Sequence, residues 1–259
     1  GALTISGNAV VTGGIVNNLG ITSSDGNGIQ IGTGGESGAT INGGIANYDN
    51  IASGLRYGVA ALEGSLSGGL TNATDATISG GLAGIFIADT FGAWSGDIYN
   101  AGQISGFNAG IQLGSGGGNG NLFFTGGITN DYEASIDSSN GPAIWISNDV
   151  ANFTGGITNH SDISGGSGAI VIESDSFGGG ITNTGHIFAT GYSADAIYAN
   201  TNWTGNFDNS GLIEGTDSAF EFVGDSYDGD FINSDRMFGG KNGVIIGAPL
   251  VSLLSNPAK

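Results

Sequence analysis

The sequence has no cysteine, three prolines and four basic residues, and each shortage excludes a class of protein. Without cysteine there is neither a disulfide framework nor a thiolate site. No stretch approaches the roughly 18 to 20 apolar residues of a membrane-spanning helix, and the first residues lack the basic and apolar regions of a secretory signal. Four lysines and arginines oppose 23 aspartates and glutamates, giving a net charge of −19. We therefore expect no nucleic-acid partner and no direct membrane insertion.

Glycine, in contrast, supplies 53 of the 259 residues. The glycines do not recur at every third position and proline is scarce, so the chain is not collagen-like. Because 39% of the residues are hydrophobic and 13 phenylalanines, 7 tyrosines and 3 tryptophans are present, the composition also differs from that of a disordered acidic chain. The short segments between glycines are rich in β-branched and aromatic residues, which predicts strands and few helices.

A repeated motif organises the chain. Gly-Gly-Ile-Thr-Asn occurs at 126–130, 155–159 and 179–183, and six looser copies bring the total to nine. The motif recurs every 24 to 30 residues, about 27 on average, which is a typical repeat length of solenoid proteins. The asparagines that end the nine copies are Asn17, Asn47, Asn72, Asn100, Asn130, Asn159, Asn183, Asn209 and Asn233.

Each asparagine is preceded by three positions whose residue type is the same or similar in all nine copies. The residue two places earlier is Ile, Leu or Phe, the residue four places earlier is always Gly, and the residue six places earlier is apolar. These offsets share one parity, so in an extended chain their side chains point to the same face. The position six places earlier is aromatic in the last six copies, which predicts an internal stack of Trp94, Phe124, Phe153, Phe177, Trp203 and Tyr227.

Two further apolar segments follow in each repeat. An isoleucine or methionine stands four residues after most of the asparagines, with Ile78 and Ile136 displaced by two, and an apolar-x-apolar pair such as Ile170/Ile172 comes next. Three short strands in each repeat, separated by turn residues, predict an all-β, right-handed parallel β-helix of about nine coils, with the hand taken from the chirality of parallel crossovers. At about 4.8 Å per coil the rod is roughly 40 Å long. We expect one domain, 1–259, with regular coils from about 10 to 247 and a C-terminal tail or cap at 248–259.

The column of nine asparagines is the most specific feature of the repeat. An asparagine at the end of an inward strand can adopt the left-handed conformation and share amide hydrogen bonds with its counterparts in the coils above and below. We therefore predict a structural asparagine ladder along the rod. The alternative is that the nine asparagines are ordinary exposed turn residues.

These repeats resemble those of bacterial β-helical surface proteins, above all the passenger regions of autotransporters and the β-strand-repeat adhesins of Gram-negative bacteria. The likeness is carried by units such as 179–187, which reads Gly-Gly-Ile-Thr-Asn-Thr-Gly-His-Ile, and it covers about residues 10 to 247. The resemblance implies a secreted, structural or adhesive β-helix at a bacterial cell surface. It also implies partners that are neighbouring coils of a longer chain, a second copy stacked end to end, or a glycan or protein of a host or matrix.

A carbohydrate-active β-helix enzyme, either a lyase or a glycoside hydrolase, is the alternative from another class. Such enzymes need convergent carboxylates, supported by histidine or basic residues. His160 and His186 are expected in surface turns, and Arg56 and Arg236 are expected as solvated charges. We predict no catalytic residue and no enzymatic activity, and the long turn at 114–123 is where a cleft would be sought.

Cation binding is a further alternative, because acidic and amide residues follow the third strand of several coils. The calcium-solenoid repeat Gly-Gly-x-Gly-x-Asp is absent, so we predict no cofactor and no metal site, with Ca²⁺ left as an option. A solvated acidic face explains this corner more simply. The residues concerned are Asp89, Asn148, Asp149, Glu173, Asp175, Asn200 and Asp225.

An ice-binding face would require a regular array of threonines on a flat sheet. The outward position between the motif's apolar residue and its asparagine holds threonine in four of nine copies and is interrupted by Tyr99 and Asp208, which is too irregular for that role. The ends of the rod are a separate question. Leu3 and Ile5 start the first strand without a preceding cap, and the apolar segment Pro249–Leu254 lies at the other end, so we expect these ends to contact further coils or a second copy.

Overall fold

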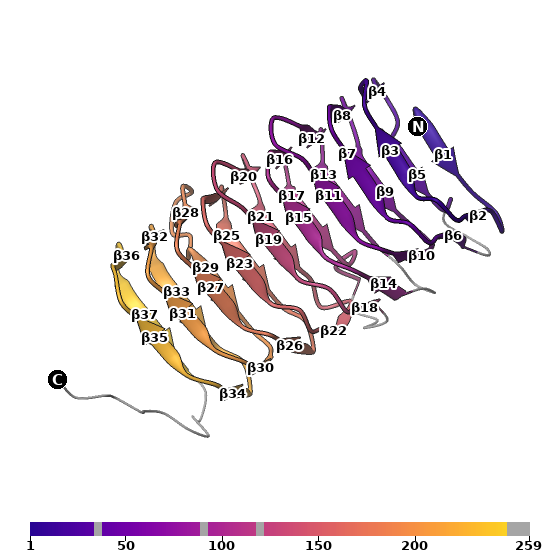
Figure 1. The fold of residues 1–259 in the computed structure, drawn as a ribbon. Helices are drawn as coiled ribbons and strands as arrows, with labels where there is room; N and C mark the ends of the chain where they lie inside the picture. Colours follow the sequence, from indigo (N-terminus) through magenta and orange to yellow (C-terminus); the bar gives the residue numbers. More distant parts are fainter. Residues whose placement is uncertain (34–37, 89–92, 118–121, 248–259) are drawn as a thin grey trace.

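The computed structural model describes residues 1–33, 38–88, 93–117 and 122–247, and the elements there are β-strands joined by turns. Figure 1 shows the strands arranged as successive coils, one behind the next, from the N-terminal to the C-terminal end of a rod. Nine coils each contribute one strand to each of four sheets, and the first strand of the chain adds a tenth strand to one of them. All described strand pairs are parallel, as predicted for a β-solenoid. No helix in this part of the chain has the length and apolarity to cross a membrane.

The four sheets, which we call A, B, C and D, are met in the order B, C, D, A along each coil. Sheet B consists of β2 (Val10–Val11), β6 (Ala39–Ile41), β10 (Gly64–Ser67), β14 (Ala93–Ser95), β18 (Leu122–Phe124), β22 (Val150–Phe153), β26 (Ser176–Gly178), β30 (Asn202–Thr204) and β34 (Ser226–Asp228). Sheet C consists of β3 (Ile15–Asn17), β7 (Ile45–Asn47), β11 (Leu70–Asn72), β15 (Ile98–Asn100), β19 (Ile128–Asn130), β23 (Ile157–Asn159), β27 (Ile181–Asn183), β31 (Phe207–Asn209) and β35 (Phe231–Asn233).

Sheets D and A complete each coil. Sheet D consists of β4 (Ile21–Ser23), β8 (Asn50–Ser53), β12 (Thr77–Gly80), β16 (Gln103–Gly106), β20 (Ser135–Ser138), β24 (Asp162–Gly165), β28 (His186–Ala189), β32 (Leu212–Gly215) and β36 (Met237–Gly239). Sheet A consists of β1 (Leu3–Ile5), β5 (Ile29–Ile31), β9 (Tyr57–Ala61), β13 (Ala83–Ile87), β17 (Ala109–Leu113), β21 (Pro142–Ile146), β25 (Gly168–Ile172), β29 (Ile197–Ala199), β33 (Ser218–Phe222) and β37 (Asn242–Ile246).

The structure divides the first of the three predicted strands into two, which is why there are four sheets. The division falls at the glycines of the motif, between the apolar position of sheet B and that of sheet C. In five coils the residue three places before the ladder asparagine is a glycine with a φ angle of 71–77°, a left-handed conformation that turns the chain and that other residues avoid. These residues are Gly14, Gly44, Gly69, Gly156 and Gly180.

Two coils carry a two-residue insertion between sheets C and D, and the structure absorbs it within the turn. Ile78 pairs with Ile51 and Ile104, and Ile136 pairs with Ile104 and Ile163, so both displaced isoleucines keep their place in the sheet D column. The turns themselves hold Asp75 and Glu133 at φ angles of 65° and 62°.

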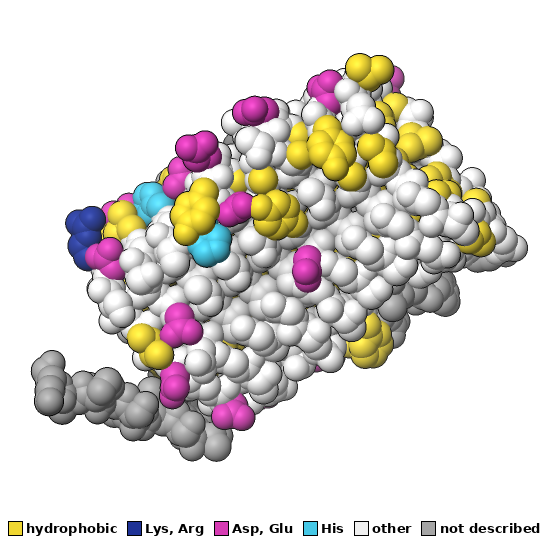
Figure 2. Space-filling model, in the orientation of Figure 1, with side chains coloured by type: hydrophobic (Ala, Val, Ile, Leu, Met, Phe, Trp, Pro, Cys, Tyr) yellow, Lys and Arg dark blue, Asp and Glu magenta, His cyan; other side chains and the backbone are white. Residues whose placement is uncertain are grey.

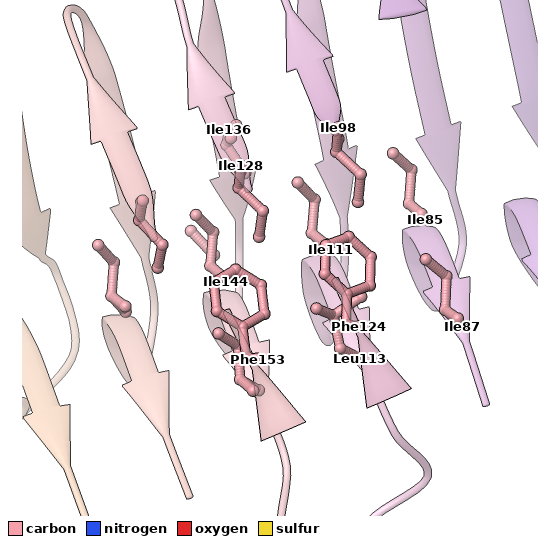
Figure 3. Packing of buried hydrophobic residues seen from close by; sticks show 14 of the residues in the cluster. Ile85, Ile87, Ile98, Ile111, Leu113, Phe124, Ile128, Ile136, Ile144 and Phe153 are labelled. Atoms are coloured by element: carbon pink, nitrogen blue, oxygen red, sulfur yellow. The ribbon is translucent and has the colours of Figure 1, made fainter. Parts of the chain in front are cut away.

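The core is formed by columns of like residues from successive coils. Ile85, Ile111 and Ile144 occupy paired positions of β13, β17 and β21, and Figure 3 shows them pointing into the rod beside Phe124 and Phe153 of sheet B. All five side chains are fully buried. Burying one such aliphatic side chain contributes about 1.5–3 kcal/mol, so each coil is stabilised mainly by its neighbours.

The glycine four places before each ladder asparagine lies against the preceding coil. A Cβ atom at eight of the nine positions would lie 2.1–2.9 Å from a backbone atom of that coil, a distance that no side chain tolerates. Gly13 is the exception, with no atom within 4 Å, because it lies in the first coil that the structure describes. The glycine column therefore results from close contact between coils.

This contact yields a matched pair of variants. Gly126→Ala is expected to lower the free energy of unfolding by about 1–3 kcal/mol, the usual cost of overpacking, because its Cβ would meet the carbonyl oxygen of Gly96 at 2.1 Å. Gly13→Ala occupies the same motif position and is expected to change stability by less than about 0.5 kcal/mol. Denaturant unfolding of both variants checks this, and equal losses would contradict the steric explanation.

Candidate functional site

The nine asparagines of the motif end the strands of sheet C and form a continuous ladder. Each one from Asn17 to Asn209 donates a side-chain amide hydrogen bond to the side-chain oxygen of the asparagine in the next coil, and the eight N···O distances are 2.7–2.9 Å. The first eight side chains are at most 4% exposed, whereas Asn233 in the last described coil is exposed.

The asparagines also bond to the main chain where sheet C turns into sheet D. Asn130, for example, donates to the carbonyl oxygen of Asp162 at 3.0 Å, and Asn100 donates to the carbonyl oxygens of Gly102 and Ser135 at 3.1 and 2.9 Å. Since a buried polar group without a partner costs about 1–3 kcal/mol, the ladder allows a chain reversal inside the rod without that cost.

The backbone conformation predicted for the ladder is wrong. The asparagines lie in the strands and have no positive φ angle. Among described residues other than glycine, the left-handed conformation occurs at Asp75, Glu133 and Ser193. An extended backbone serves the ladder better because it keeps the asparagines in register, as Asn130 is with Asn100 and Asn159.

The six aromatic residues of sheet B are buried, with at most 2% of each side chain exposed. The centroids of rings in neighbouring coils are 4.6–6.0 Å apart, and in four of the five contacts the ring planes are nearly parallel and stacked. The contact between Phe177 and Trp203 is tilted by 49°. These rings lie inside the rod, where they are not accessible to a ligand. Such pairs contribute about 0.5–1.5 kcal/mol beyond the burial of their area.

The polar atoms at the edge of this stack have partners. The indole nitrogens of Trp94 and Trp203 donate to main-chain oxygens of Gly96 and Gly205 at 3.1 and 2.7 Å. The hydroxyl of Tyr227 donates to the carbonyl oxygen of Asp230 at 3.1 Å. Burial raises the pKa of the Tyr227 hydroxyl well above its ordinary value, so it stays protonated and keeps donating at physiological pH.

Histidine 160 lies in the turn between sheets C and D, as predicted, stacks on Tyr132 and contacts the Thr184 hydroxyl at 2.8 Å. The prediction that His186 lies in a turn is wrong. It is the first residue of β28, because seven of the nine strands of sheet D begin one residue before the inward isoleucine. Its Nε2 lies 2.9 Å from an oxygen of Glu214. Figure 2 shows both histidines (cyan) beside hydrophobic and acidic side chains on one face of the rod. Arg56 and Arg236 are exposed.

Four of the predicted acidic and amide residues lie together at the corner between sheets A and B. They line a shallow hollow of about 240 Å³, which we call the corner hollow; its lining consists of Glu173, Ser174, Asp175, Asn200, Thr201, Asn202 and Asp225. Ser174 and Thr201 are 1% and 5% exposed, and their hydroxyl oxygens are 3.4 Å apart. Asn148 is exposed outside this lining, and Asp89 lies outside the described residues.

Asp149 has a different role from the one expected. A side-chain oxygen of Asp149 accepts hydrogen bonds from the backbone amides of Ser115 and Gly117, both at 2.8 Å, and from the Ser115 hydroxyl at 2.6 Å. It therefore fixes the start of the long turn at 114–123, of which residues 118–121 lie outside the described part. A Cβ atom added at Gly116 would lie 3.3 Å from the Trp145 ring, so this turn borders the outer face of sheet A.

The outer face of sheet A carries a row of residues that the sequence pattern did not single out. Trp145, Val171, Tyr198 and Glu221 are paired in register on β21, β25, β29 and β33, and all four are half-buried. The Trp145 indole donates to Glu173 at 2.9 Å, which joins this row to the corner hollow. The residue between each inward apolar pair was the available signal, because strand alternation places it outside.

Carboxylates surround this row. Burial raises the pKa of Glu221, and a hydrogen bond to Asp195 together with the charges of Asp195 and Asp217 raises it further. Burial also raises the pKa of Tyr198, with added contributions from Glu173, Glu221 and Asp195. Among the described residues, no group of three or more histidine, aspartate or glutamate side chains is arranged to hold a metal ion.

The raised pKa of Glu221 gives a pH dependence with a definite sign. The folded protein binds a proton here that the unfolded chain has lost, so stability falls as pH rises from the ordinary carboxyl range through the raised pKa. Glu221→Gln is expected to raise the unfolding temperature at pH 7 and to leave it unchanged at pH 3.5, where both states are protonated. Glu133→Gln, which removes an equal charge from a remote turn, is the control. A gain of the same size in both variants would contradict the assignment.

Comparisons with known proteins give no relative. No protein-family model, no curated protein and no solved structure matches this chain. The resemblance to bacterial surface repeats therefore depends on the motif, and the structure supports its coarser part, a β-solenoid built from repeats.

Proposed function

We propose that this chain is a structural and adhesive β-helix of a bacterial cell surface or extracellular fibre. The observation that carries the proposal is the continuity of four parallel sheets and one asparagine ladder through all nine coils, which makes a stiff rod suited to hold a binding surface away from its attachment. The extracellular location is supported by the Gly-, Asn- and Thr-rich repeats that resemble those of autotransporter passengers.

The coils at both ends of the described rod support contact with further coils. Phe231 and Met237 are only partly buried in the last coil, and Val11 and Ile21 are only partly buried in the first. Another coil of the same column pattern would cover the sheet edges and these apolar side chains. It is supplied either by a longer chain or by a second copy stacked end to end.

The proposal is tested by adhesion and by assembly. Beads coated with the protein are expected to be retained under flow on mucin or extracellular-matrix surfaces, beyond the retention of beads coated with a globular protein of matched negative charge. Electron microscopy of the same preparation is expected to show rods that join end to end. Equal bead retention would refute the adhesive part, and isolated rods about 40 Å long at high concentration would refute stacking of copies.

The alternative enzyme has one observation in its favour, since Glu173, Asp175 and Asp225 line the same hollow. Glycoside hydrolysis needs two carboxyl groups at a defined separation across the bond that is cleaved. Incubating the protein with a panel of polysaccharides and measuring new reducing ends or unsaturated products separates the two functions. Turnover would replace the adhesive proposal with the enzymatic one.

A further inference from the structure

The corner hollow and the outer row of sheet A form one continuous surface. Val171 and Glu173 are two residues apart, as are Tyr198 and Asn200, so each pair points to the same side of its strand or the residues directly after it. The row supplies the rings of Trp145 and Tyr198, and the hollow supplies carboxylates and amides. The Trp145–Glu173 hydrogen bond fixes the two parts relative to each other.

The rings are spaced by the fold itself. Trp145 and Tyr198 lie on strands separated by β25 alone, so their backbones are about 10 Å apart, with Val171 between them. An aromatic ring with an accessible face packs against the C–H face of a pyranose, and it also attracts a cation through its π system. Two rings and a valine in one row make a stiff strip that is long enough for neighbouring sugars of an oligosaccharide.

The hollow matches a ligand that both donates and accepts hydrogen bonds. The amide of Asn200 is exposed in this lining and can both donate and accept, and the carboxylates of Glu173, Asp175 and Asp225 accept. The hydroxyls of Ser174 and Thr201 are buried and bond to each other, and Thr201 also donates to the carbonyl oxygen of Asn202 at 3.5 Å. Hydroxyl and amide groups donate as well as accept, whereas a lysine ammonium only donates. A sugar that carries both hydroxyl and ammonium groups fits this lining, because it offers donors to the carboxylates and both donors and acceptors to the amides.

The charge of the surface selects among sugars. Glu173, Asp175 and Asp225 line the hollow, and Asp195 and Glu221 border the row, whereas Lys241, the nearest lysine in sequence, is paired with Asp217 at 2.9 Å. Carboxylates that line one hollow repel uronates and sialates and attract ammonium groups.

We propose that this surface binds an oligosaccharide that carries amino groups, with its sugar rings against Trp145 and Tyr198 and its ammonium groups at the carboxylates of the corner hollow. The assignment depends on the described residues of coils five to nine, and it is independent of the location and assembly of the rod. A rod that does not adhere to mucin or matrix can still bind this ligand.

Isothermal titration calorimetry with a β-1,4-linked glucosamine tetramer tests the proposal, with cellotetraose as the neutral probe of the same linkage. We expect the glucosamine tetramer to bind and cellotetraose to bind at least about tenfold more weakly, because cellotetraose lacks the ammonium groups that contact the carboxylates. Equal affinity for the two probes, or no binding of the glucosamine tetramer, would overturn the proposal.

Variants separate this site from general attraction to an acidic protein. Trp145→Ala and Asp225→Asn are each expected to weaken glucosamine-tetramer binding about tenfold or more, and to leave binding of spermine almost unchanged. Tyr132→Ala and Asp208→Asn, which change a ring and a charge elsewhere on the surface, are the matched controls. Asn200 and Asp225 are exposed, so Asn200→Ala and Asp225→Asn keep the test valid where Trp145→Ala unfolds. Wild-type affinity in these hollow variants would overturn the proposal.

Discussion

The hydrogen bond between one coil and the next is the interaction on which the whole structure depends. The strands have two to five residues, too few to be stable alone, and each is held by backbone bonds to the same strand of adjacent coils. The asparagine ladder extends this pairing to a corner where sheet hydrogen bonds are interrupted. This pairing also sets the positions of the inward side chains, because equivalent backbone positions of successive coils place like residues on top of one another. The aromatic stack of sheet B and the isoleucine columns are results of that register.

The same register explains which features the sequence could predict. Any property repeated in every coil was visible as a column, and the parallel solenoid, the nine coils and the inward positions were predicted from columns alone. The fourth sheet was not predicted, because the motif is continuous in sequence and its division depends on a change of backbone direction, made in five coils by a left-handed glycine such as Gly156 or Gly180. The position of His186 was misjudged for a related reason: a strand boundary shifts by one residue without changing the apolar pattern.

The candidate site was less predictable, since it belongs to a few coils and leaves no column. Glu173, Asp175, Asn200 and Asp225 were grouped correctly at one corner because they follow the same strand in successive coils. Trp145 and Tyr198 were missed because the outward position of sheet A changes from coil to coil, from Gln112 through Trp145 to Glu221. A regular scaffold with irregular outward positions separates stability from recognition, so surface residues can vary while the core stays constant.

The asparagine ladder has one more property, which is its polarity. In all eight ladder bonds the amide nitrogen belongs to the earlier coil and the accepting oxygen to the later one. The side-chain dipoles consequently add up along the axis instead of cancelling, and the two faces of any coil are chemically different. One face offers acceptors and the other offers donors. Two such faces are complementary in a head-to-tail arrangement, whereas head-to-head contact opposes like groups, so the ladder gives a direction to any assembly that continues the rod.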